Sequence, residues 1–103
     1  MKRAIMVDPE DSVATLLSDA EAGEPIYIVT ADGKETKALK AREPISMGHK
    51  VALMSLKRGD KVMKYGAVIG QAIRQIREGD HVHVHNMKSL RLIIPLNTSR
   101  IPK

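Results

Sequence analysis

Short apolar segments separated by Gly and Pro turns make up most of this chain, and their spacing predicts a mostly β domain. Asp32-Gly33 stands between two of these segments and predicts a hairpin. We find no internal repeat. The predicted strands cover residues 4–7, 25–30, 35–43, 51–56, 61–66 and 67–76.

One segment near the amino end follows a helical pattern instead. Asp8 is a suitable N-cap, Pro9 suits the first helical position and Gly23 is a typical stop. The pattern predicts one short amphipathic helix over residues 9–22, with its apolar face formed by Val13, Leu16, Leu17 and Ala20.

Three histidines alternate with valines after the last glycine turn: His81, Val82, His83, Val84 and His85. In a strand this pattern places the imidazoles on one face, while the valines pack on the other. Adjacent histidines, roughly 6.6 Å apart, can share a metal ion, whereas the outer pair, at roughly 13 Å, cannot without a bend. A metal site would therefore combine one adjacent pair with groups from elsewhere. An exposed polar face of an edge strand remains the alternative.

Length and composition are those of a single domain over residues 1–103. Cysteine is absent, which excludes disulfides, thiolate ligands and a cysteine nucleophile. No apolar run reaches the roughly 20 residues that span a bilayer. We expect a soluble, cytoplasmic protein with no membrane contact.

Positive charge is concentrated in the second half of the chain. Residues 1–50 hold 7 Lys and Arg against 9 Asp and Glu, whereas residues 51–103 hold 10 against 3. This predicts an anionic partner or substrate. Because the chain has only two tyrosines and no other aromatic residue except histidine, we expect no nucleic-acid binding.

Four motifs, in order, resemble the SAF domain of the altronate and galactarate dehydratase family, and the small subunit of sulfolactate sulfo-lyase is similar. They are GHK at 48–50, KRGDKVMKYG at 57–66, IG at 69–70 and GDHVHVHN at 79–86. The resemblance implies a compact β-clip fold, to which the residue pattern adds the short N-terminal helix. Residues 90–103 then form either a final edge strand or a tail that docks on a partner.

The resemblance also implies an activity and a set of site residues. Members of this family remove water or bisulfite from a hydroxylated carboxylic acid, and the dehydratases among them are associated with a divalent metal, usually iron. On the matched motifs, His83 and His85 are expected as metal ligands, and His49 and His81 as catalytic groups, with His49 a further ligand or an acid or base. The residues expected to bind substrate are Lys50, Lys64, Lys88 and Asn86.

The dehydratases continue into a much larger domain, whereas this chain stops at Lys103. We therefore expect the small subunit of a lyase, inactive alone, whose partner is a large catalytic subunit and whose substrate is an anionic hydroxy acid. Assembly as a homo-oligomer is also open. The alternative is a non-catalytic SAF carbohydrate-binding module, although three histidines on one face favour the lyase.

Overall fold

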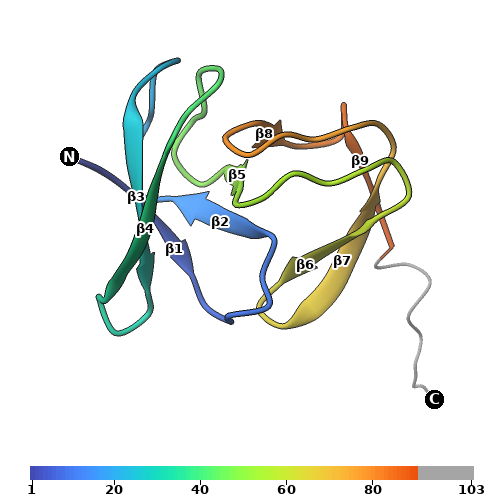
Figure 1. The fold of residues 1–103 in the computed structure, drawn as a ribbon, viewed down its shortest axis with the longest axis horizontal. Coiled ribbons are helices and arrows are strands. Elements are labelled where there is room, and N and C mark those ends of the chain that lie inside the picture. The colour runs from blue at the N-terminus through green and yellow to red at the C-terminus, as the bar shows by residue number, and fades with distance from the viewer. Residues whose placement is uncertain (91–103) are drawn as a thin grey trace.

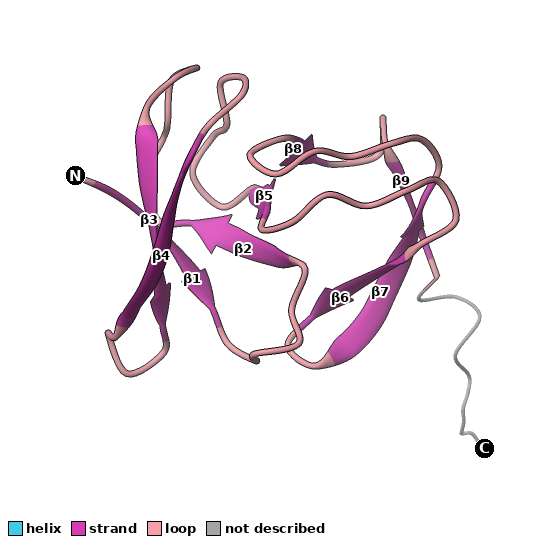
Figure 2. Ribbon diagram, viewed as in Figure 1, coloured by secondary structure: helices cyan, strands magenta, loops and turns pink. Residues whose placement is uncertain are grey.

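Two β-sheets account for the regular structure in this computed structural model, which describes residues 1–90. Figure 1 shows their arrangement, and Figure 2 shows that strands and loops make up the described part. A six-stranded sheet has the order β4-β3-β1-β2-β5-β8, and a three-stranded sheet has the order β6-β7-β9. The strands are β1 (Lys2–Met6), β2 (Val13–Leu16), β3 (Pro25–Thr30), β4 (Glu35–Lys40), β5 (Lys50–Ala52), β6 (Lys61–Lys64), β7 (Ala67–Ala72), β8 (His81–Val82) and β9 (Met87–Ser89).

The mostly β prediction fits this structure, and the hairpin predicted around Asp32-Gly33 is confirmed. β3 and β4 pair antiparallel, with Pro25 opposite Lys40 and Ile26 opposite Leu39. β1 then pairs parallel with β3 and antiparallel with β2. The predicted tail at residues 90–103 lies outside the described residues, except for Leu90.

The predicted helix over residues 9–22 is wrong. β2 occupies its centre and pairs with β1 on one side and β5 on the other. Val13, Ala14 and Leu16 are buried, so both faces of this strand are covered. Leu17, expected on the apolar face of the helix, is 50% exposed. The apolar spacing that suits a helix also suits a central strand buried on both faces, which the sequence pattern alone does not separate.

The residues expected to start that helix form a tight turn. The Asp11 N–H donates to the Asp8 carbonyl at 3.0 Å, and the Glu10 N–H donates to the Asp8 carboxylate at 2.8 Å. Asp11 is buried, and its carboxylate accepts a 2.9 Å hydrogen bond from the Gly66 N–H. Acidic residues near a Pro favour turns as well as helix starts. Through this hydrogen bond, the turn before β2 of the six-stranded sheet contacts the β6–β7 hairpin.

A seven-residue motif occurs four times, so the prediction of no internal repeat is wrong. Each copy has an apolar residue, two residues, Gly, two residues and a second apolar residue, and both apolar residues are buried. The four glycines have φ between 85° and 95°, a backbone conformation that costs a larger residue strain. We name the copies the Gly23 turn (residues 20–26), the Gly48 turn (45–51), the Gly59 turn (56–62) and the Gly79 turn (76–82).

The four turns form two pairs with the same reciprocal hydrogen bonds. Ala20 and Ile45 exchange two backbone bonds at 2.8 and 2.9 Å, and Leu56 and Ile76 exchange two at the same distances. Each glycine N–H donates to the residue four positions before the partner turn: Gly23 to Ala41, Gly48 to Leu16, Gly59 to Ala72 and Gly79 to Ala52. The two pairs are therefore two copies of one local structure.

The short β5–β8 pairing lies between two apolar cores. Val51 on β5 belongs to the core of the large sheet, whereas Ala52 on β5 and Val82 on β8 belong to a second core with Val62 and Ile76. The backbone of β5 and β8 is thus fixed from both sides. The residues next to these strands carry most of the candidate chemistry.

Candidate functional site

His49 stands at a position where the other three turns carry an acid. In those turns the residue after glycine is Glu24, Asp60 or Asp80. Its carboxylate accepts a 2.8 Å hydrogen bond from an N–H three residues earlier, which closes the turn. His49 has an imidazole at this position in place of the carboxylate acceptor.

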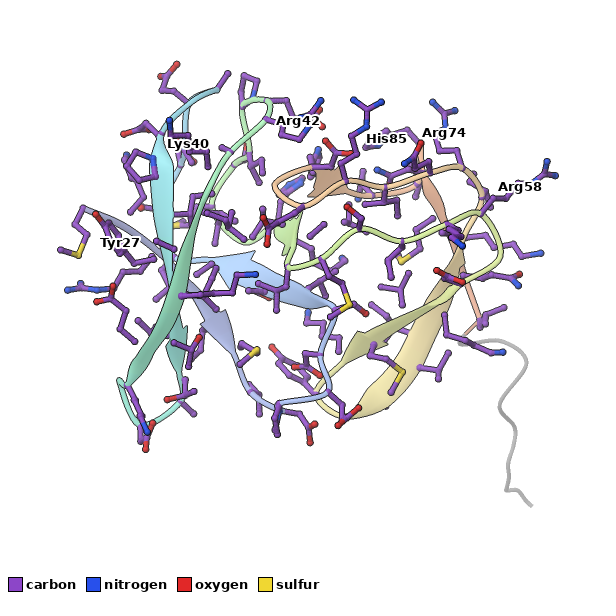
Figure 3. The ribbon with its side chains drawn as sticks, viewed as in Figure 1. Tyr27, Lys40, Arg42, Arg58, Arg74 and His85 are labelled. Atoms are coloured by element: carbon purple, nitrogen blue, oxygen red, sulfur yellow. The ribbon has the colours of Figure 1, made fainter. Side chains whose placement is uncertain are left out.

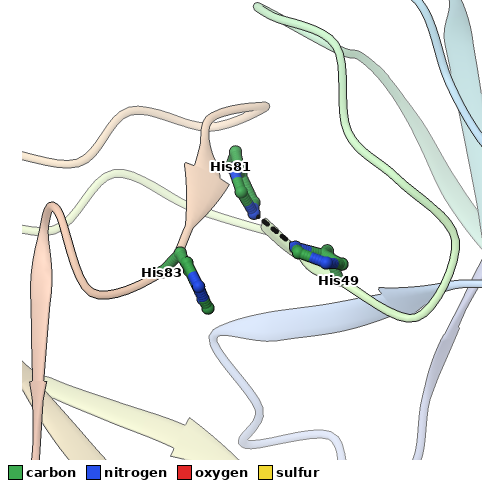
Figure 4. A group of neighbouring side chains, drawn as sticks. All are labelled: His49, His81 and His83. Atoms are coloured by element: carbon green, nitrogen blue, oxygen red, sulfur yellow. Dashed lines mark hydrogen bonds between the residues drawn. The ribbon is translucent and has the colours of Figure 1, made fainter.

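The His49 imidazole contacts the imidazole of His81. β5 and β8 pair antiparallel, with Lys50 opposite Val82 and Val51 opposite His81. This register brings His49 Nδ1 within 2.9 Å of His81 Nε2, although the two residues are 32 positions apart in the chain (Figure 4). One of these nitrogens carries the proton and the other accepts it.

His83 joins the pair because the chain turns after β8. The His83 N–H donates to the Asn86 side-chain oxygen at 2.9 Å, and the Met87 N–H donates to the His83 carbonyl at 2.9 Å. The His83 ring stacks on the His81 ring, with centroids 5.5 Å apart and an angle of 10° between planes. One nitrogen from each of His49, His81 and His83 lies within 4.8 Å of the others.

The strand predicted through residues 81–85 is wrong beyond Val82. Val82 is fully buried as expected, but Val84 is 74% exposed and packs on no face. His85 is exposed (Figure 3). Its ring centre lies 5.6 Å from that of His81. Its nitrogens lie outside the group formed by the other three histidines. The chain does bend after β8, but this bend places His83 beside the His49–His81 pair and leaves His85 outside the group.

Burial lowers the pKa of His81 below its ordinary value, and the neighbouring His49 imidazole lowers it further. The Glu43 carboxylate raises the pKa of His81, and it also accepts a 3.2 Å hydrogen bond from the backbone N–H of His81. A lowered pKa keeps His81 neutral near pH 7, which is the state that binds a metal ion or accepts a proton.

A cavity of about 550 Å³ adjoins the histidines, because His83 lines it as well. Lys50 and Lys64 are part of its wall. Burial lowers the pKa of Lys50, and repulsion from the Lys64 ammonium group lowers it further. Like charges brought together beside a cavity indicate an anion site.

Two residues expected to bind substrate are placed differently. Asn86 is buried, and its amide has backbone partners at both ends, the His83 N–H at 2.9 Å and the His81 carbonyl at 2.8 Å. The amide therefore holds the turn that positions His83. Lys88 is exposed on β9 and is not part of the cavity wall.

Tyr65 was not among the predicted site residues, but it lines the cavity beside Lys64. Lys64 pairs with Ala67, so Tyr65 and Gly66 form the two-residue loop of the β6–β7 hairpin. Such loops favour Asn-Gly, and a tyrosine in that place was the available signal.

The three histidines form a donor set that suits a divalent metal. Imidazole nitrogens bind Zn, Fe, Ni and Cu, at about 2.0–2.1 Å for Zn. The His49 and His81 nitrogens already lie near the separation that one shared ion requires, and the exposed His83 side chain can move toward them. The residues present therefore fit a metal centre with open positions.

The described residues include no helix that is long and apolar enough to cross a membrane.

Comparison with known proteins gives matches of two lengths. The altronate dehydratase of Bacillus subtilis is 36% identical over 89 residues, which are 86% of this chain and 17% of that protein. The (2R)-sulfolactate sulfo-lyase subunit alpha of Chromohalobacter salexigens is 34% identical over 88 residues, or 84% of this chain and 94% of the relative. The subunit of the same name from Paracoccus pantotrophus is 45% identical over 66 residues, or 64% and 97%.

The chain thus spans a small part of the dehydratase and nearly the whole of each alpha subunit. The family described as the altronate/galactarate dehydratase SAF domain matches residues 2–90, which include both sheets, all four glycine turns and the histidine group. This chain belongs to the altronate/galactarate dehydratase SAF domain family.

Proposed function

We propose that this protein is the small subunit of a lyase that eliminates water or bisulfite from a hydroxylated carboxylic acid. The observation that carries the proposal is the group of His49, His81 and His83 beside a cavity lined by two lysines. Two relatives that the match covers over nearly their whole length are named as alpha subunits, which supports a partner subunit for this chain as well. We infer that the partner is the larger catalytic subunit.

Elimination beside a carboxylate needs three things from the site. A base removes the proton next to the carboxylate, a positive group stabilises the charge that develops, and an acid assists the leaving group. When bound, a divalent metal supplies Lewis-acid stabilisation of that charge. We propose His49, His81 and His83 as its ligands, and iron as the metal.

The other residues of this chain orient the substrate. Lys50 and Lys64 present ammonium groups to an acidic group in the cavity, within reach of the histidines. Asn86 keeps His83 in place through its two backbone hydrogen bonds. His49 is the one histidine whose residue type departs from its turn motif, so we propose that it also moves a proton whenever it is not a ligand.

The test is reconstitution of the full chain with the proposed large subunit. We expect lyase activity in the complex, little in either chain alone, and bound metal by elemental analysis. His49→Ala, His81→Ala and His83→Ala should each lower the metal content, whereas His85→Ala should retain it. Full metal retention in all three variants would defeat the ligand assignment. Metal loss in His85→Ala would restore the set expected from the sequence.

A further inference from the structure

The two pairs of glycine turns place equivalent residues on the surface. As copies of one local structure, the Gly23 turn corresponds to the Gly79 turn, and the Gly48 turn corresponds to the Gly59 turn. Leu17 and Ile73 are then equivalent, because each stands three residues before the first residue of its turn. Leu17 is 50% exposed and Ile73 is 39% exposed. Each pair thus carries an exposed apolar side chain at the same place.

The charges around this apolar residue have opposite signs in the two pairs. Five further outer positions hold two acids and no cation in the pair of the Gly23 and Gly48 turns, and four cations and no acid in the other pair. We call Leu17 with the first set the acidic end, and Ile73 with the second set the basic end. The first set is Ser18, Asp19, Glu21, Ser46 and Met47, and the second is Arg74, Gln75, Arg77, Lys57 and Arg58. Apart from the half-buried Ser18, all of these residues are exposed.

Two arginines of the basic end come from different turns and face each other. Leu56 and Ile76 exchange backbone hydrogen bonds at 2.8 and 2.9 Å in an antiparallel bridge. Arg58 stands two residues after Leu56. Arg74 stands two residues before Ile76, so the antiparallel direction brings both arginines to the same side of the bridge. Both side chains project away from the ribbon in Figure 3. Like charges at facing positions repel, and an opposite charge from outside relieves that repulsion.

Neither end takes part in the ion pairs within residues 1–90. Those pairs join Lys2 to Glu24, Lys37 to Glu78 and Arg42 to Asp80. In the acidic end, the Asp19 carboxylate accepts a 2.8 Å hydrogen bond from the Met47 N–H, which joins the two turns. The charges of both ends are therefore available to groups outside this part of the chain.

The placement of the two ends determines which contact between copies they favour. The Gly23 turn leads into β3 and the Gly59 turn leads into β6, and the β5–β8 pairing lies between these strands in Figure 1. A twofold dimer through either end brings like charges together, because such a contact uses the same surface twice. A head-to-tail contact instead joins opposite charges around two apolar residues, which is the composition of a specific interface.

We propose that this protein binds a second copy of itself head to tail, with the acidic end of one copy on the basic end of the next. Leu17 of one copy packs against Ile73 of the next, and the acids of the first meet the arginines of the second. This inference goes beyond the proposed function and does not depend on it.

The contact has a consequence for the histidine group. The Gly48 turn carries both Met47 of the acidic end and His49 of that group. The head-to-tail contact therefore brings the basic end of the second copy beside the histidines.

Sedimentation velocity of the full chain tests the association. In low salt, we expect the weight-average sedimentation coefficient to rise with chain concentration. In about 1 M salt the Debye length falls to about 3 Å, so the coefficient should stay near the monomer value. A chain that stays monomeric at every concentration in low salt overturns the proposal.

Charge reversal connects the association to the basic end. Arg58→Glu and Arg74→Glu should each raise the dissociation constant about tenfold or more, because each places like charges in the contact. Lys34→Glu is the matched control: it makes the same change in net charge, and Lys34 is exposed between β3 and β4, outside both ends. Unchanged association in both arginine variants, or an equal loss in Lys34→Glu, overturns the proposal.

A mixture of two double variants tests the head-to-tail arrangement. Arg58→Glu with Arg74→Glu removes the basic end, and Leu17→Lys with Glu21→Lys removes the acidic end. Both double variants should keep the urea unfolding midpoint of the parent, since the changed side chains are exposed. Each should be monomeric alone, whereas an equal mixture should associate, because each variant retains the end that the other lacks. A mixture of folded variants that stays monomeric overturns the arrangement.

A different occupant of the basic end gives a different result. If the parent chain is monomeric and Arg58→Glu loses binding of the proposed large subunit, the basic end belongs to that subunit and the proposal is overturned. Head-to-tail association in a protein without lyase activity defeats the proposed function and leaves this inference.

Discussion

In the pair formed by the Gly59 and Gly79 turns, both residues that follow glycine are aspartates, whereas the pair formed by the Gly23 and Gly48 turns carries Glu24 and His49. The reciprocal backbone hydrogen bonds are the same in both pairs. The pair formed by the Gly23 and Gly48 turns therefore keeps the fold with one carboxylate acceptor fewer at the position that follows glycine. This contrast separates what the backbone needs from what the histidines add.

The largest effect should come from the closest contact within the turns. A Cβ at Gly79 would lie 2.2 Å from the Lys40 carbonyl, whereas a Cβ at Gly48 meets nothing within 4 Å. Gly79→Ala adds a clash with backbone to the strain of positive φ, so we expect a loss of about 2–5 kcal/mol in the free energy of unfolding. Gly48→Ala carries the strain alone and should cost about 1–2 kcal/mol.

Urea unfolding of the two glycine variants measures this difference. If Gly48→Ala proves as damaging as Gly79→Ala, the close approach of β4 to the Gly79 turn does not determine stability.

His49→Asn makes the exceptional turn resemble the other three. An Asn side chain can accept a hydrogen bond from the Ser46 N–H, as Asp60 does from the Lys57 N–H at 2.8 Å. We expect stability to stay within about 1 kcal/mol of the parent chain. Metal affinity should fall about a hundredfold or more, since even outer-shell partners of a metal contribute about 10–100-fold.

Unfolding and metal titration of the same His49→Asn sample test both expectations. Retained metal affinity would show that the histidine exception serves something other than a metal centre. His85→Asn is the control, because His85 is exposed and lies outside the three-histidine group.

Asp60→Ala and Asp80→Ala compare the acid within one pair. Both carboxylates accept a 2.8 Å hydrogen bond from their own turn, but Asp80 also meets the Arg42 side chain at 3.0 Å. Asp60→Ala should cost about 1 kcal/mol, a typical value for a lost turn or cap hydrogen bond. Asp80→Ala should cost slightly more, by an amount within the 0–1 kcal/mol that exposed ion pairs contribute.

Chemical denaturation in low and high salt checks the aspartate pair, because screening removes only the Arg42 contribution. A larger loss in Asp60→Ala than in Asp80→Ala would contradict the assignment.

Local signals predicted the hairpin at residues 25–40, because its turn and its alternating strands lie within one short stretch. They failed for residues 9–22, because Asp8, Pro9 and Asp11 suit a turn as well as a helix start. What decided between the two was the pairing of β2 with β5, which no local pattern contains.

For the candidate site too, local signals predicted one part and not the other. The residue types were predictable, since His81 and His83 stand out in the sequence. The meeting of His49 with His81 depends on the β5–β8 register, across 32 positions. His85 was expected as a ligand from its place in the matched motifs, but the turn closed by Asn86 leaves its nitrogens outside the three-histidine group.

The smallest effect should be a pH dependence that the second turn pair lacks. Burial and His49 lower the pKa of His81 below its ordinary value of 6.5, so the unfolded chain binds a proton more readily than the folded chain just below pH 6.5. Stability is therefore full above pH 6.5 and falls as the pH drops through the folded pKa of His81. In the metal-free chain, we expect a small decrease in unfolding free energy as the pH falls below 6.5, and this decrease should be absent in His81→Gln. A His81→Gln chain with the same pH profile as the parent would assign the decrease to other groups. The control is His85→Gln, which leaves the His49–His81 contact intact and should keep the profile of the parent.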